Sequence, residues 1–166
     1  PEGLVVFAHG LGSGGHNPYM PLIDALTDEG YLVFTYDATG NGESGGKDVG
    51  AIKTAVEALK NDGALAIFPQ GHRYPGENPA TTPTKNGAAL ICYRSKCDVI
   101  PVCIKTKGHK YHFLGRIEIV FGKPIKYADF GFVNGGTEEY RAATDKIFGE
   151  VLRLGGFEAD HKEDEN

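Results

Sequence analysis

Cysteine is scarce in this chain of 166 residues, which contains three: Cys92, Cys97 and Cys103. No two of them form a CxxC pair, so they do not indicate a zinc site, and their odd number argues against a disulfide framework. Free thiols are typical of a reducing compartment, and we therefore expect a cytoplasmic protein. We expect it to need no metal and no cofactor.

Long apolar runs and an excess of positive charge are also missing. No run approaches the ~20 apolar residues of a membrane-spanning helix. The formal net charge is -5 at pH 7, which argues against nucleic acid as a partner, since such proteins present a basic face. Glycine is abundant by contrast, with 24 residues gathered largely in clusters. These clusters mark loops, where functional sites concentrate.

Alternating segments predict an α/β fold with a mainly parallel sheet flanked by helices. A short, wholly apolar run at 4–8 is typical of a strand buried on both faces. The predicted strands are 4–8, 31–37, 64–69, 98–106 and 115–122, and the predicted helices are 18–29, 48–61, 84–95 and 137–154. The last two strands are expected to form a hairpin-like pair, and 158–166 an acidic, solvated tail.

The first two predicted strands are followed by glycine-rich loops, in "VVFAHGLGSGG" and "GYLVFTYDATGNGESGG". Residues 4–46 thereby resemble the opening strand, helix and strand of the α/β-hydrolase family. The resemblance implies that His9 and the glycine after it build an oxyanion loop, in which backbone N–H groups stabilise developing negative charge.

Ser44 lies in Gly42-Glu43-Ser44-Gly45-Gly46, which matches the G-x-S-x-G pattern of a serine nucleophile. A nucleophile elbow is a sharp turn from strand to helix, yet several loop residues separate Asp37 from Gly42. We therefore favour Ser44 as a polar loop residue. No second G-x-S-x-G follows residue 46. An esterase-like α/β-hydrolase, with Ser44 or a serine outside this pattern as nucleophile, remains the alternative enzyme.

The chain from Lys47 onward carries "DVGAIKTAVEALKNDGALAIFPQGHRYPG", "KNGAALICYRSKCDVIPVCIKT" and "IEIVFGKPI". These segments resemble the glycerolipid acyltransferase family, the 1-acylglycerol-3-phosphate acyltransferases. The resemblance implies transfer of an acyl group from acyl-CoA or acyl-carrier protein to lysophosphatidate in phospholipid synthesis. It also implies peripheral contact with the inner, cytoplasmic face of the membrane.

The family's phosphate-binding block, F-P-E-G-T-R, appears here as Phe68-Pro69-Gln70-Gly71-His72-Arg73. Gly71 lets the backbone approach a ligand, and the Arg73 guanidinium suits a phosphate. Lys85 is expected to add a second positive charge. Gln70 replaces a glutamate and can still hydrogen-bond a glycerol hydroxyl, while His72 replaces a threonine.

Two further observations concern the same resemblance. A second family block surrounds Pro101, in Val99-Ile100-Pro101-Val102. The structural alternative for the first block is an ordinary surface loop in which Arg73 pairs with Glu77.

The family's catalytic motif, H-x-x-x-x-D, is absent, because no histidine of the chain has an aspartate five positions later. In the family that histidine takes the proton from the acceptor hydroxyl. His9 is the candidate replacement, since it follows the first strand as the missing base would, with Asp24 or Asp37 as orienting acid. We therefore expect impaired chemistry, and a non-catalytic phosphate- or lipid-binding remnant is a third hypothesis.

The two resemblances meet at about residues 45–47. We interpret 1–46 as a hydrolase-like fragment, 47–157 as an acyltransferase-like part and 158–166 as the tail, which together could still form one compact domain. A chimera or fusion of fragments is the simplest hypothesis for this arrangement.

Overall fold

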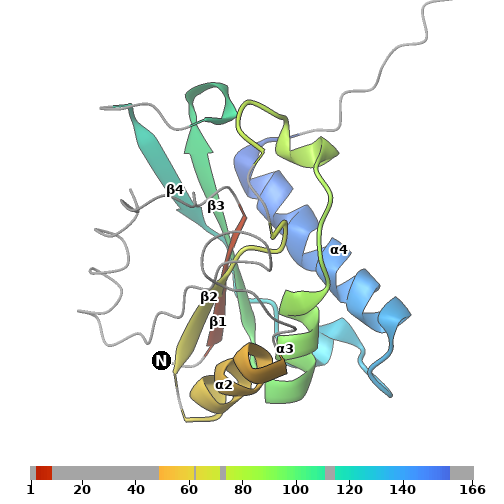
Figure 1. Cartoon of the computed structure of the whole chain (residues 1–166). Coiled ribbons are helices and arrows are strands. Elements are labelled where there is room, and N and C mark those ends of the chain that lie inside the picture. Colours follow the sequence, from red (N-terminus) through yellow and green to blue (C-terminus); the bar gives the residue numbers. More distant parts are fainter. Residues whose placement is uncertain (1–2, 9–48, 62, 72–73, 111–114, 158–166) are drawn as a thin grey trace, which may run out of the picture.

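The computed structural model describes residues 3–8, 49–61, 63–71, 74–110 and 115–157. Helices and strands alternate within these residues (Figure 1). The strands are β1 (Gly3–Ala8), β2 (Ala64–Ile67), β3 (Val99–Thr106) and β4 (Ile117–Phe121). The helices are α2 (Val49–Lys60), α3 (Gly87–Ser95) and α4 (Thr137–Gly155), with short 3-10 helices η1 (Pro79–Thr81), η2 (Lys107–His109) and η3 (Tyr127–Phe130).

The four strands form one mixed sheet in the order β2-β1-β3-β4. β1 pairs in parallel with β2 on one side and β3 on the other, and β4 runs antiparallel to β3. Val6 lies opposite both Ile67 and Pro101. The predicted mixture of helices and strands is therefore confirmed, as is the hairpin-like pair, and the sheet combines two parallel pairings with one antiparallel pairing.

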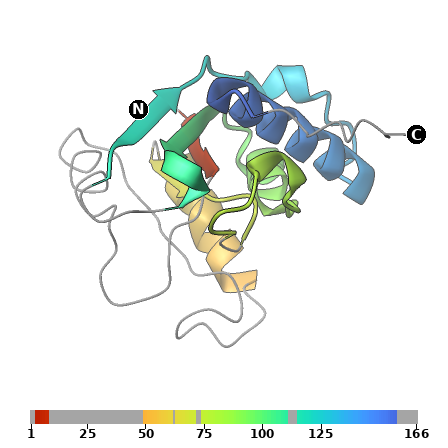
Figure 2. The same cartoon turned by 90° about the horizontal axis from the view of Figure 1, so that it is seen from above.

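The three longer helices lie on one face of this sheet (Figures 1 and 2). In α2 the buried side chains Ala55, Val56 and Leu59 recur at helical spacing, and they pack against Leu65 and Ile67 of β2. α4 contributes Phe148 and Val151, which pack around Cys103 of β3. Among the described residues, no helix has the length and apolarity needed to cross a membrane.

The opposite face of the sheet has a smaller apolar cluster. It is formed by Ala66, Val102 and Ile104, with side chains that alternate with those facing the helices. All four residues of β2 are buried, as expected of a strand covered on both faces.

Several predicted boundaries need correction. The strand predicted over 64–69 ends at Ile67, because Pro69 has no N–H for a ladder. The helix predicted over 84–95 begins at Gly87, with Asn86 as its N-cap, and the Lys85 N–H that precedes it donates to the Pro69 carbonyl at 2.6 Å. The strand predicted over 98–106 begins at Val99. The helix predicted at 18–29 and the strand predicted at 31–37 lie outside the described residues.

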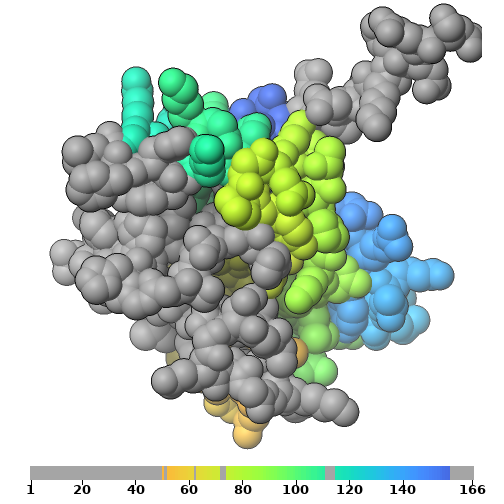
Figure 3. All heavy atoms as spheres, turned by 45° about the horizontal axis from the view of Figure 1, so that its top comes forward, coloured from red at the N-terminus to blue at the C-terminus, as the bar shows by residue number. Residues whose placement is uncertain are grey.

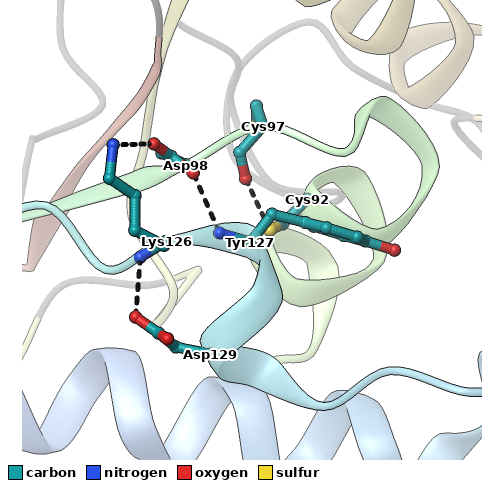
Figure 4. Close-up of polar contacts among 6 residues, drawn as sticks. All are labelled: Cys92, Cys97, Asp98, Lys126, Tyr127 and Asp129. Carbon is teal, nitrogen blue, oxygen red and sulfur yellow. Dashed lines mark hydrogen bonds and ion pairs between the residues drawn. The ribbon is translucent and has the colours of Figure 1, made fainter.

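All three cysteines are free thiols, as expected. Burial raises the pKa of the Cys103 thiol to about 11, so this thiol stays protonated at neutral pH. The Cys92 thiol donates to the Cys97 carbonyl at 3.2 Å, just beyond the end of α3 (Figure 4).

Asp98 ties the segment after β4 to the start of β3 (Figure 4). Its carboxylate accepts from the Lys126 ammonium at 2.7 Å and from the Tyr127 N–H at 2.9 Å. Backbone hydrogen bonds between Val99 and Ile125, of 2.9 and 2.8 Å, complete the junction. The hydrogen bond from Lys126 is the main reason why the pKa of Asp98 lies below its usual value of 3.8.

This lowered pKa predicts a pH-dependent effect of Asp98→Asn. A carboxyl group with a depressed folded pKa stabilises the protein above its unfolded pKa, and this contribution is lost as the pH falls through the folded value. We expect Asp98→Asn to cost about 1 kcal/mol at pH 7, because Lys126 is exposed and the pair is screened. In urea unfolding the cost should shrink as the pH falls below 3.8 and through the lowered folded pKa. Asp145→Asn, at an exposed position on α4, is the control; an unchanged cost at pH 3 would show that the carboxylate charge is irrelevant.

Candidate functional site

The candidate site lies at one edge of the sheet. β1, β2 and β3 are parallel, so their carboxyl ends meet at the same edge, where α/β proteins bind ligands. β2 ends there at Ile67 and delivers the predicted phosphate block, of which residues 68–71 are described. β1 ends there at Ala8, whose partner in β3 is Cys103. His9, His72 and Arg73 lie outside the described residues, as does Ser44.

Phe68 to Gly71 form a tight turn directly after β2. The Gly71 N–H donates to the Phe68 carbonyl at 3.1 Å, and Pro69 at the second position suits such a turn. Gly71 has a φ of 61°, in the left-handed region that favours glycine. The turn therefore gives a local reason for a glycine at position 71.

Lys85 lies against this turn, although 14 positions separate it from Gly71 along the sequence. A Cβ atom on Gly71 would lie 2.9 Å from the Lys85 Cδ and 3.2 Å from its Nζ. The backbone tie from Lys85 to Pro69 holds the two segments together. The absence of a side chain at Gly71 therefore leaves room for a lysine ammonium beside the turn.

Gln70 points into the protein and is only 2% exposed. Its side-chain N–H donates to the Thr82 hydroxyl oxygen at 2.5 Å, and that hydroxyl donates to the Pro79 carbonyl at 2.8 Å. The Gln70 Oε1 is buried and has no hydrogen-bond donor among the residues that the structure describes.

The loop that follows the turn packs against the end of β3. The Gly76 N–H donates to the His109 carbonyl of η2 at 3.0 Å. Figure 3 shows this loop (yellow-green) beside the segment around η2 and β4 (green to teal) on one face of the molecule. Lys105, near the end of β3, contacts Glu118 of β4 at 3.4 Å, so its charge is partly balanced.

Pro101 lies within the sheet rather than in a loop. It occupies the same row as Val6 and Ile67, and its carbonyl accepts the Gly122 N–H at 2.8 Å. Since the N and O of a paired antiparallel residue face the same neighbour, the missing N–H of Pro101 faces β4 and not β1. The parallel ladder to β1 therefore loses nothing from this proline.

Thr82 is the residue that sequence reasoning missed. It is buried, whereas its neighbour Thr81 is exposed and donates its hydroxyl to Asn78. The segment "ATTPT" has no periodicity that distinguishes these two threonines. Only the fold of the loop reveals which of them faces Gln70.

Comparison with protein families finds a match at the N-terminal end. The family model for serine aminopeptidase, S33 (Hydrolase_4), matches residues 1–62. This hydrolase match includes β1 and extends through α2, beyond residue 46, where the sequence placed the end of the hydrolase-like fragment.

The chain is also similar to an acyltransferase. The chain is 29% identical over 82 residues to the 1-acyl-sn-glycerol-3-phosphate acyltransferase of Bacillus subtilis. These 82 residues make up 48% of this chain and 39% of that protein. The chain thus spans about two fifths of the length of this relative. Both resemblances derived from the sequence, to hydrolases at the N-terminal end and to an acyltransferase, are confirmed, and each covers less than half of the chain.

Proposed function

We propose that this chain is an acyltransferase-like protein of phospholipid synthesis that binds lysophosphatidate through residues 68–73. Its acyl-transfer activity is impaired because the H-x-x-x-x-D motif is absent. The observation that carries the proposal is the turn at Gly71 with the Lys85 side chain against it, at the carboxyl edge of the sheet. A left-handed glycine beside a lysine is an arrangement in which backbone and ammonium groups approach a phosphate together.

Arg73 is the proposed main phosphate ligand, with Lys85 as a second cation and His72 beside them. Phe68 and Pro69 place the turn at the end of β2. Pro101 of β3 lies opposite Val6 of β1, which in turn lies opposite Ile67 at the end of β2. The identity of 29% with a protein whose name specifies an acylglycerol phosphate supports a phosphate-bearing acceptor.

The acyl donor in this proposal is acyl-CoA or acyl-carrier protein, and no cofactor or metal takes part. The acceptor is a lipid, so the proposed location is cytoplasmic, with peripheral contact at the inner membrane face. His9 is the candidate replacement for the missing base, and we propose that it contributes little to the rate. Ala8, which precedes it, ends β1 at the same edge at which Ile67 ends β2.

Arg73→Ala tests the binding part of the proposal. Loss of hydrogen bonds to a charged phosphate should weaken lysophosphatidate binding about 10- to 100-fold, measured by calorimetry below the micelle concentration. Arg94→Ala, at an exposed position on α3, is the matched control and should leave binding unchanged. Monoacylglycerol, which lacks the phosphate, should not distinguish Arg73→Ala from the parent chain. Equal lysophosphatidate affinity in both would refute the phosphate site.

The hydrolase match over residues 1–62 favours a second candidate function, ester hydrolysis with Ser44 as nucleophile. The lack of a second G-x-S-x-G after residue 46 counts against it. If binding persists and neither chemistry occurs, the non-catalytic lipid-binding remnant becomes the preferred description.

A further inference from the structure

We propose that Gln70 and Thr82 form a buried bridge that positions Lys85 beside the Gly71 turn, so that Gln70 acts through the loop and not on the ligand. Thr82 thereby becomes a positioning residue of the candidate site. The consequence for ligand binding rests on the proposed function, whereas the loop geometry does not.

The directions of the two hydrogen bonds at the Thr82 hydroxyl determine what residue 70 must supply. A threonine hydroxyl has one hydrogen, and that of Thr82 is given to the Pro79 carbonyl at 2.8 Å. The Thr82 oxygen therefore accepts from Gln70, and residue 70 must supply an N–H. An ionised glutamate has no hydrogen to donate, so the glutamine found here is the residue that matches Thr82.

Two ties close the loop between the turn and α3. One is the side-chain bond from Gln70 to Thr82, and the other is the backbone bond from Lys85 to Pro69. Between them, the η1 helix is capped by the Asn78 side chain, which accepts from the Ala80 N–H at 3.0 Å. Thr82 lies only three residues before Lys85. If the bond between Gln70 and Thr82 is lost, only the backbone bond from Lys85 to Pro69 still holds Lys85 to the turn.

The burial of Gln70 and Thr82 shows that they do not contact a ligand at the surface directly. Gln70 and Thr82 are 2% and 8% exposed, and the Gln70 Oε1 is itself inaccessible to solvent. Lys85, by contrast, is exposed beside Gly71. A ligand at the surface of the turn thus meets Lys85, while Gln70 determines where Lys85 lies.

Four variants of the full chain test the bridge through lysophosphatidate affinity. Thr82→Val and Gln70→Met remove either end at similar size, and each should weaken binding about tenfold, or about 1.4 kcal/mol. Thr82→Ser retains the hydroxyl and should stay within about twofold of the parent chain. Thr81→Val makes the same change at the exposed neighbour and should have no effect. The double variant Gln70→Met/Thr82→Val should lose no more than either single variant, because both act on one bridge.

Hydrogen exchange provides a readout that needs no ligand. In Thr82→Val the Lys85 amide, which donates to Pro69, should exchange about tenfold faster than in the parent chain. The Lys96 amide, which donates to Cys92 at the end of α3, should keep its rate and so exclude general unfolding.

The outcomes separate the two proposals. If the parent chain binds no lysophosphatidate but Lys85 exchange accelerates, the proposed function fails and the bridge stands. If Gln70→Met weakens binding while Thr82→Val does not, Gln70 contacts the ligand directly and the bridge proposal is overturned. Unchanged Lys85 exchange in Thr82→Val also overturns it.

Discussion

Release of coenzyme A from acyl-CoA by the purified chain should rise by less than about twofold when lysophosphatidate is added, since a positioned general base contributes about 10²- to 10⁴-fold. The chain has no H-x-x-x-x-D motif to supply that base. A thiol-reactive dye measures the release, and the Bacillus subtilis acyltransferase is the positive control. Its rate under the same conditions should be higher by that factor.

The His9→Ala variant tests whether His9, in the hydrolase-like N-terminal segment, acts as the general base for acyl transfer. We expect the variant to match the parent chain, because misplacement of a catalytic group by about 1 Å can cost about 100-fold. Lysophosphatidate-dependent release that His9→Ala abolishes would contradict this expectation and make His9 the base. Phenylmethylsulfonyl fluoride is the parallel probe for Ser44. A covalent adduct on Ser44 would identify Ser44 as a nucleophile and favour ester hydrolysis as the function of the chain.

The confirmed elements are those with strong local signals. The helix predicted over 137–154 is α4, Thr137–Gly155, because apolar periodicity extends over its whole length and Gly156 ends it in the left-handed conformation. The helix predicted over 48–61 is α2, Val49–Lys60, for the same reason. The start of α3 was predicted three residues too early, because residues 84–86 belong to the loop, in which the Lys85 N–H donates to the Pro69 carbonyl.

The candidate site was predictable only in part. The motif names Gln70 and Gly71, and the sequence adds Lys85 as a nearby charge, but neither says that a glutamine amide points inward or that a lysine packs over a glycine. Those facts depend on loop closure between residues 69 and 85, which no local periodicity encodes. The roles assigned to these residues, and to Arg73 and His9, stay predictions.

The structure also shows how a short apolar strand joins two kinds of sequence. β1 lies in the segment that matches hydrolases, yet it pairs with β2 and β3, both of which follow that segment in the chain. A central strand needs free backbone groups on both of its edges, and β1 uses both of them, one for β2 and one for β3. The division at 46 is therefore a statement about sequence resemblance, and the described strands form one sheet.

The other large effect concerns stability, at Gly135 before α4. Its φ is 70°, and a Cβ there would lie 2.3 and 2.4 Å from two ring atoms of Tyr93 and 2.7 Å from the Tyr140 hydroxyl. Tyr93 and Tyr140 belong to an aromatic cluster between α3 and α4, with ring centroids 5.6 Å apart. Gly135 also donates its N–H to Glu139, whose pKa is lowered chiefly by the Val133 N–H, with those of Asn134 and Gly135 adding to it.

Gly135→Ala should therefore destabilise the protein by about 2–5 kcal/mol, because the left-handed backbone and the overlap with Tyr93 each add a cost. Thermal unfolding should show a melting temperature lower by about 5–15 °C. Gly149→Ala is the matched control, since a Cβ at this exposed helical position meets no atom within 4 Å. It should stabilise the protein by about 0.5–1 kcal/mol, because alanine is the better helix former. If the two variants melted together, Tyr93 would have to move away at little cost, and the aromatic cluster would not hold α3 against α4.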